Sequence, residues 1–230
     1  MKTTIFMGLI SVASIALAAC GQSASNGNSM NHNAMMKNSN SSTNMNGMDH
    51  NSMPMNSNTS MNHSEMKSSP NAASQPFDLQ FLDTMTHHHQ GAVDMSTMAL
   101  TKSQNAELKQ FVQKIIDDQN KEIGQMKEWR DKWYAGKPMA MNMEMPGMGD
   151  SMKMMMGDGM KKMEAATGKD FDIHFFDMMT PHHAGATVMA KEALTKAEHA
   201  ELKTLATQII KEQEAEIKTM TEWKAKWGIK

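Results

Sequence analysis

The chain has 230 residues, a net charge of −2, and 30 methionines against a single tyrosine. The near-zero charge, with acidic and basic residues mixed along the helical parts, gives no indication of a basic surface for nucleic acid. A core built mainly of methionine would be loosely specified, so the methionine content points to a chemical use of the thioethers.

Residues 1–20 have the pattern of an export signal, with Lys2 ahead of an apolar run. The small residues before Cys20 resemble a bacterial lipoprotein cleavage box, so we predict that Cys20 becomes the lipidated first residue of the mature protein. Lipid would hold this periplasm-facing protein to the membrane, and Gly21 favours the outer membrane in a host that has two. The alternative is an ordinary signal peptide cleaved after the alanines. No later run is apolar enough to span a bilayer.

Residues 21–76 form a low-complexity segment of Asn, Ser, Met, His and Gly without Val, Ile, Leu, Phe, Trp or Tyr. Such a segment cannot bury a core, and we predict a disordered linker. It spells Met-x-His-x-x-Met three times, with Met30, His32 and Met35, then Met48, His50 and Met53, then Met61, His63 and Met66. Thioether and imidazole donors suit Cu(I) or Ag(I), so the linker is predicted to bind metal. Compositional drift and a sacrificial oxidation trap are the alternatives.

Two copies of one unit follow, 77–134 and 171–228, identical at about half of their positions. Apolar residues recur in both at helical spacing, and each copy is interrupted once, at 103–105 or at 197–199. Each unit is thus a helical hairpin with one apolar face, and two hairpins bury those faces against each other. We therefore predict an all-α fold, in which the hairpins 77–134 and 171–230 close one four-helix bundle.

The insert between the hairpins, 135–170, contains eleven methionines and no histidine. Its glycines and prolines argue against one continuous helix, although a short helix at about 161–167 is compatible with the sequence. Two interpretations stay open, a loop packed over the bundle end and a second soft-metal tract.

Pro181 lies inside the second copy of the helical pattern. A proline there removes one backbone hydrogen bond and clashes with the carbonyl four residues back. It suits a helix start, with Thr180 as the cap, so the sequence predicts a kink or a restart at Thr180.

The motif Met-Thr-x-His-His-x-Gly-Ala occurs once in each hairpin, at 85–92 and at 179–186. A single cysteine excludes thiolate metal sites within the fold, so a soft-metal site must use methionine and histidine. Polar side chains on a core stripe are costly unless they are paired or bound to something. The predicted metal ligands are Met85, His88, His89, Met95 and Met126, and in the second copy Met179, His182, His183, Met189 and Met220.

A purely structural interpretation of these residues is the alternative. The histidines would then be core residues hydrogen-bonded to Gln119 or Glu122, or to the counterparts Gln213 and Glu216, which would satisfy their polar atoms. The methionines would fill gaps in the core.

The repeated pattern resembles domain-of-unknown-function family 305, which includes CopM-like periplasmic copper-binding proteins. The matching residues are Phe77, Asp78, Phe81, Asp83, Met85, His88, His89 and Ala92, then Gln119, Glu122, Ile123, Met126 and Trp129, repeated from Phe171 to Trp223. The resemblance covers both hairpins. It implies a ferritin-like four-helix bundle that binds copper or silver through methionine and histidine. The linker and the insert look like periplasmic silver- and copper-buffering peptides.

These observations predict an exported protein that sequesters or buffers copper and contributes to copper resistance or homeostasis. Thioethers prefer Cu(I), with silver as its mimic, and histidine also accepts Cu(II). The predicted partners are metal ions, the membrane through a lipid anchor, and other copper-handling envelope proteins. A structural envelope lipoprotein is the first alternative. A di-metal oxidoreductase is the second, but it needs about four carboxylates and paired Glu-x-x-His motifs, so we predict no enzymatic activity.

Overall fold

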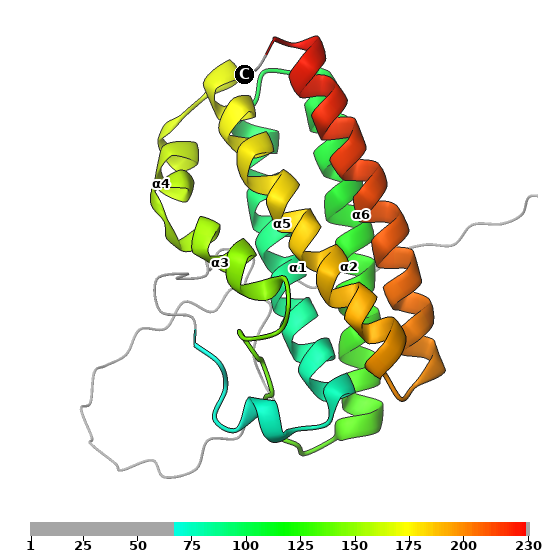
Figure 1. Ribbon diagram of the computed structural model, residues 1–230. Coiled ribbons are helices and arrows are strands. Elements are labelled where there is room, and N and C mark those ends of the chain that lie inside the picture. The colour runs from blue at the N-terminus through cyan, green and yellow to red at the C-terminus, as the bar shows by residue number, and fades with distance from the viewer. Residues whose placement is uncertain (1–66, 229–230) are drawn as a thin grey trace, which may run out of the picture. The chain divides into compact units, whose positions relative to one another are not determined.

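The computed structural model describes residues 67–228. Its elements are the short 3-10 helix η2 (Ala72–Ser74) and the helices α1 (Phe77–Lys102), α2 (Ala106–Tyr134), α3 (Met148–Met156), α4 (Asp158–Ala165), α5 (Gly168–Lys196) and α6 (Ala200–Lys226) (Figure 1). No strand occurs between residues 67 and 228, and the all-α fold is confirmed. Cys20 and the predicted metal ligands of the linker lie outside the described residues.

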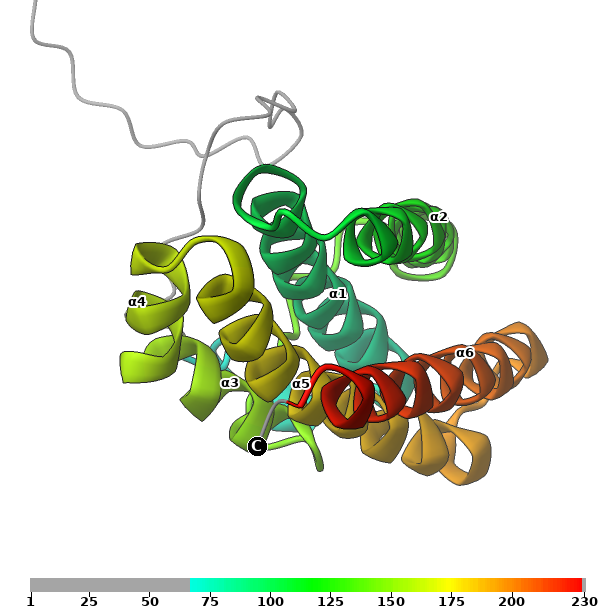
Figure 2. The ribbon, with the colours of Figure 1, turned by 90° about the horizontal axis from the view of Figure 1, so that it is seen from above.

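Four long helices form two packed hairpins, as predicted. α1 packs along α2, α5 packs along α6, and α1 and α5 cross at the centre (Figure 2). α2 and α6 lie on the outer sides and meet through Phe111 and Trp223, whose rings are 5.1 Å apart. Because α1 and α5 are covered on several sides, the core gathers on these two helices, and it includes Phe81, Met85, Phe175 and Met179.

Both predicted breaks between helices, at 103–105 and at 197–199, are confirmed. At each break a side-chain amide or carboxylate caps the start of the next helix. The side chain of Asn105 accepts hydrogen bonds from the amides of Glu107 and Leu108 at the start of α2. α6 has no such cap of its own. Asp78, at the start of α1, instead accepts hydrogen bonds from the backbone N–H groups of Glu198 and His199. A cap of this kind stabilises a helix by about 1 kcal/mol, and here it also ties the two hairpins together.

Tyr134, the only tyrosine in the chain, should ionise at unusually high pH. Burial raises the pKa of its phenol to about 12, and the carboxylates of Asp78 and Glu198 add to the shift. The stability that Tyr134 contributes is therefore complete below the unfolded pKa of about 10 and is lost as the pH rises through the folded value. Tyrosinate absorbance followed against pH measures the midpoint. Equal midpoints in native and denatured protein would contradict the expectation.

The restart predicted at Thr180 is wrong, because α5 is one helix of 29 residues with Pro181 inside it. A proline in a helix interior costs about 3 kcal/mol. α5 packs against α1, α6, α3 and α4, and these contacts hold it helical across the proline. Thr180 does not cap a helix, and its hydroxyl lies 3.9 Å from the sulfur of Met220.

The insert folds as two short helices, whereas the sequence was compatible with one short helix at about 161–167. α4 covers most of that range, but α3 was not predicted. α3 begins after Gly147, whose φ of 86° lies in the left-handed region that glycine tolerates, and Gly157 separates α3 from α4. Both helices pack on α5. Several methionines of the insert are buried in the common core, namely Met145, Met148, Met155, Met160 and Met163.

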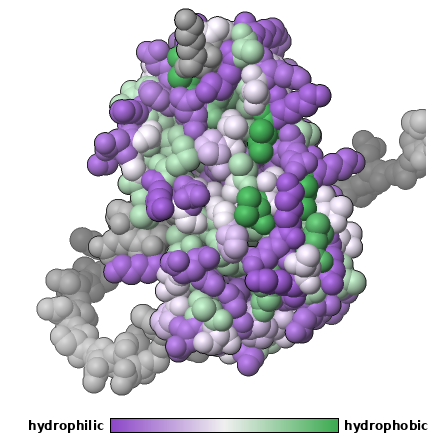
Figure 3. All heavy atoms as spheres, in the orientation of Figure 1, coloured by the Kyte–Doolittle hydropathy of each residue, from purple (hydrophilic) through white to green (hydrophobic). Residues whose placement is uncertain are grey.

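On the face shown in Figure 3, hydrophobic side chains form separate patches among hydrophilic ones. Among the large apolar residues, Met139, Met156, Val188 and Leu194 are exposed. The described helices include none with the length and hydropathy needed to cross a bilayer.

Candidate metal centre

Four histidines form a row across the middle of the protein, where α1 crosses α5. The rings of His88 and His182 pack against each other, with centroids 3.8 Å apart and planes tilted by 34°. His89 lies 6.4 Å from His88, and His183 lies 6.2 Å from His182. All four side chains are buried. The two predicted histidine pairs are therefore one cluster, to which each hairpin contributes half.

A carboxylate closes each end of this row. His89 donates a hydrogen bond from Nε2 to Glu122 on α2 over 2.7 Å, and His183 donates one from Nε2 to Glu216 on α6 over 2.8 Å. When a neutral imidazole donates from Nε2, the lone pair is on Nδ1. Nδ1 of His89 and Nδ1 of His183 are buried and make no hydrogen bond within residues 67–228. A carboxylate on one nitrogen and an open lone pair on the other is the usual arrangement of a metal-binding histidine.

His88 is held in its neutral form. Burial lowers the pKa of His88 well below its ordinary value, and the imidazoles of His182, His89 and His183 lower it further. Both of its ring nitrogens are buried and make no hydrogen bond within the described part of the chain. Unsatisfied buried polar atoms cost about 1–3 kcal/mol each, so a ligand that uses them would be favoured. Neutral imidazole is also the form that binds a metal ion.

The predicted methionine ligands all lie in the core. Met85, Met95 and Met126 are buried in the first hairpin, and Met179, Met189 and Met220 are buried in the second. Burial alone fits both core packing and ligation, so the assignment of these residues as ligands stays a prediction.

Sequence reasoning left the partner of each histidine open between a glutamine and a glutamate. The glutamates are the partners, while the side-chain amides of Gln119 and Gln213 are buried and make no hydrogen bond within the range 67–228. Glu122 and Glu216 thus belong to the candidate site as groups that orient the histidines. Their position three residues after the glutamines on one helical stripe was the available signal, but only the helix register decides which side chain reaches the imidazole.

Histidine, cysteine and carboxylate alone do not form a metal site here. Within residues 67–228, no group of three or more such side chains is arranged to hold an ion. The imidazole nitrogens of the row and the thioether sulfurs of the buried methionines are donors that suit soft ions better than Mg²⁺ or Ca²⁺.

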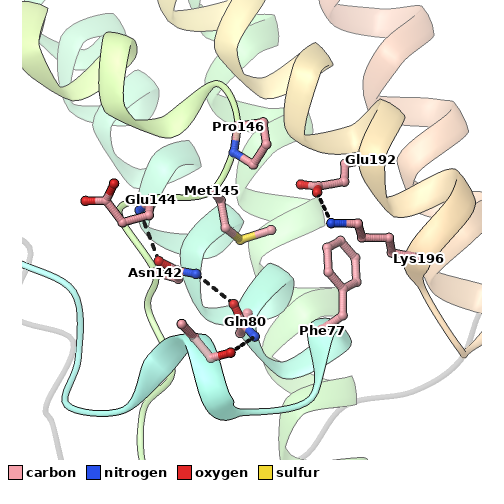
Figure 4. A pocket seen from close by; sticks show the side chains of 9 residues that line it. Phe77, Gln80, Asn142, Glu144, Met145, Pro146, Glu192 and Lys196 are labelled. Carbon is pink, nitrogen blue, oxygen red and sulfur yellow. Dashed lines mark hydrogen bonds and ion pairs between the residues drawn. The ribbon is translucent and has the colours of Figure 1, made fainter.

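A pocket lies away from the histidine row. It has a volume of about 280 Å³ and opens between the start of α1, the insert and the end of α5. Figure 4 shows the amide of Asn142 donating to Gln80 at its wall, beside the single thioether of Met145. No histidine lines it, so it does not serve the same chemistry.

A sequence profile of the family described as Domain of unknown function (DUF305) matches residues 16–130 and again residues 78–224. The chain belongs to the DUF305 family. The two matches cover the two copies of the histidine motif, so the resemblance seen in the sequence is confirmed. No curated protein sequence matches this DUF305 chain.

Solved structures of CopM are similar to this DUF305 chain. CopM in its Cu(I)-bound form is 36% identical, with 65% of this chain and 96% of CopM covered and a TM-score of 0.54. CopM in its Cu(II)-bound form is 38% identical, over 65% of this chain and 97% of CopM, with a TM-score of 0.55. CopM has also been solved with silver. A DUF305 protein from Streptomyces coelicolor, described as secreted, is 31% identical over 67% of this chain and 94% of its own, with a TM-score of 0.58.

Proposed function

We propose that this protein binds copper in the cell envelope, sequestering or buffering Cu(I) through methionine and histidine, with Ag(I) as a mimic and Cu(II) as a second state. The observation that carries the proposal is the buried histidine row, in which His88, His89 and His183 keep ring nitrogens without a hydrogen-bond partner in the described structure. A row of core histidines that only packed would leave these atoms unsatisfied at a cost. The similarity to CopM, solved with Cu(I), Cu(II) and Ag, supports the same choice of ions.

The proposed setting is outside the cytoplasm, on a lipid anchor at Cys20. The export signal and the cleavage box before Cys20 support it, as does the similarity to a Streptomyces protein described as secreted. In this setting the three Met-x-His-x-x-Met sequences of the linker act as a second, weaker set of copper ligands. A protein of this kind needs no catalytic step, and handing copper to other envelope proteins by ligand exchange fits its many thioethers.

The first test replaces the two central histidines of the row together, with His88→Ala and His182→Ala in one protein. We expect the tightest Cu(I) site to weaken by about 100-fold or more, since two ligands are removed together. The measurement is a titration of the lipid-free chain from Gly21 onward with Cu(I) against a competing chelator, with Zn²⁺ and Fe²⁺ as reference ions. His174→Ala, which removes a partly exposed histidine of α5, is the control.

A chain that begins at Lys67 separates the bundle from the linker. It keeps Ser68 and Ser69, which hydrogen-bond to the backbone of the insert, and removes all three linker motifs. We expect fewer Cu(I) ions bound at saturation but an unchanged tightest site. Cu(I) binding no stronger than Zn²⁺ binding, in both chains, would mean that the histidines are core residues only.

A further inference from the structure

The methionine-rich insert is seated directly on the two histidine motifs. The glycine of each motif, Gly91 on α1 and Gly185 on α5, faces the insert at a distance that leaves no room for a side chain. A β-carbon at Gly185 would lie 1.9 Å from Oγ of Ser151 and 2.4 Å from the carbonyl oxygen of Gly147. The two motifs therefore hold α3 against the bundle at the level of the histidine row.

At Gly91 the space of the missing side chain is filled by Met155 of α3. A β-carbon there would lie 3.0 Å from Sδ and 2.8 Å from Cε of Met155, and 3.4 Å from Nε2 of His182. The sulfur of Met155 and a ring nitrogen of His182 thus approach the same point from different elements. Met155 is buried, although its neighbour Met156 is exposed.

The contact between the His88 and His182 rings limits how they can bind a metal ion. Imidazole lone pairs lie in the ring plane, so two rings packed face against face with a tilt of 34° do not aim their nitrogens at one ion between them. A metal ion bound to either ring then needs further ligands from elsewhere in the fold. The sulfur of Met155 approaches the same point at Gly91 as Nε2 of His182 and is one such donor, and a thioether beside an imidazole suits a soft monovalent ion.

We propose that Met155 is a metal ligand that the insert delivers to His182, so that the site is complete only when α3 is docked. The inference rests on the proposed copper-binding function and goes beyond it, because it assigns a ligand outside the histidine motifs and gives the insert a role in binding. Core packing alone is the competing explanation. Leucine would satisfy packing nearly as well as methionine, since the two have similar volumes, but it has no sulfur.

Met155→Leu therefore tests ligation with little disturbance of packing, and Met156→Leu is the matched control on the same helix. We expect Met155→Leu to weaken the tightest Cu(I) or Ag(I) site by about tenfold or more, and Met156→Leu to leave it unchanged. Methionine-methyl NMR of the lipid-free chain from Gly21 onward gives a second measurement. With Ag(I) below one equivalent, the resonance that Met155→Leu removes should be among the first to shift.

The outcomes separate this inference from the proposed function. If Met155→Leu binds as the wild type does and its methyl resonance does not move, while the His88→Ala/His182→Ala protein loses the tight site, Met155 is a packing residue and copper binding stands. If the wild type shows no preference for Cu(I) over Zn²⁺, both are wrong. Loss of affinity in Met155→Leu together with an unchanged melting temperature would support the assignment.

Discussion

Replacing Glu122 and Glu216 together with glutamine should weaken Cu(I) binding by about 10- to 100-fold, although neither carboxylate touches the ion. Each accepts the Nε2 hydrogen bond of a histidine, over 2.7 Å from His89 and 2.8 Å from His183. That bond fixes the imidazole orientation and leaves Nδ1 as the donor atom. A carboxylate also makes the imidazole a stronger base than an amide does, so the metal bond weakens when the charge is removed.

Glutamine is the informative replacement because its amide oxygen can still accept the hydrogen bond. Alanine would leave a buried histidine without its partner, and breaking a buried pair in this way costs about 3–5 kcal/mol. Lost binding would then be confused with partial unfolding. Glu107→Gln with Glu214→Gln is the matched control, since these changes remove the same charge from the same two helices at exposed ion pairs.

Chelator competition measures the affinity, and thermal unfolding of the metal-free proteins measures the fold. Equal affinity in the Glu122→Gln/Glu216→Gln protein and the wild type would show that the two pairs only stabilise the bundle. In that case the hydrogen bonds from Glu122 and Glu216 to His89 and His183 would have no part in metal binding.

Much of the fold followed from periodicity and repetition. The breaks at 103–105 and 197–199 were predictable because each interrupts a helical stripe that resumes afterwards, and a duplicated hairpin must bury its apolar face on its copy. The prediction of a restart at Thr180 was wrong because helix propensities of single residues say nothing about how many other helices pack against α5. α5 is covered by four other helices, and their contacts outweigh the cost of the proline.

The candidate site was predictable only in its residue types. The sequence placed both histidine pairs on core stripes, but the contact between the rings of His88 and His182 depends on how α1 packs against α5. Met155 was one of eleven methionines in the insert. The glycines of the insert argued against a continuous helix, so the position of Met155 on α3 was not predicted. Met155 lies near His182 because it fills the space that the missing side chain of Gly91 leaves open. A glycine adds nothing to the hydrophobic periodicity of a sequence, so this contact could not be predicted.

Gly185→Ala should detach the insert and destabilise the protein, in contrast with the usual effect of this substitution in a helix. Glycine in a helix interior is normally less stable than alanine by about 0.5–1 kcal/mol. At Gly185 the new methyl group would lie 2.4 Å from the carbonyl oxygen of Gly147, which is backbone and cannot rotate away. The β-carbon of any residue at 147 would likewise meet the carbonyl oxygen of Gly185 at 2.2 Å. The two backbones are in contact, so α3 must move.

Gly124→Ala is the matched control, because Gly124 also lies within a helix, α2, and nothing lies within 4 Å of its missing β-carbon. We expect Gly124→Ala to be neutral or slightly stabilising and Gly185→Ala to cost about 1–3 kcal/mol, the typical penalty of overpacking. Thermal unfolding measures both, and limited trypsin digestion at Lys153, Lys161 and Lys162 reports whether the insert has detached. An unchanged digestion pattern in Gly185→Ala would mean that the bundle can shift to admit the methyl group. Detachment accompanied by the same loss of Cu(I) affinity as in Met155→Leu would tie the docking of α3 to completion of the metal site.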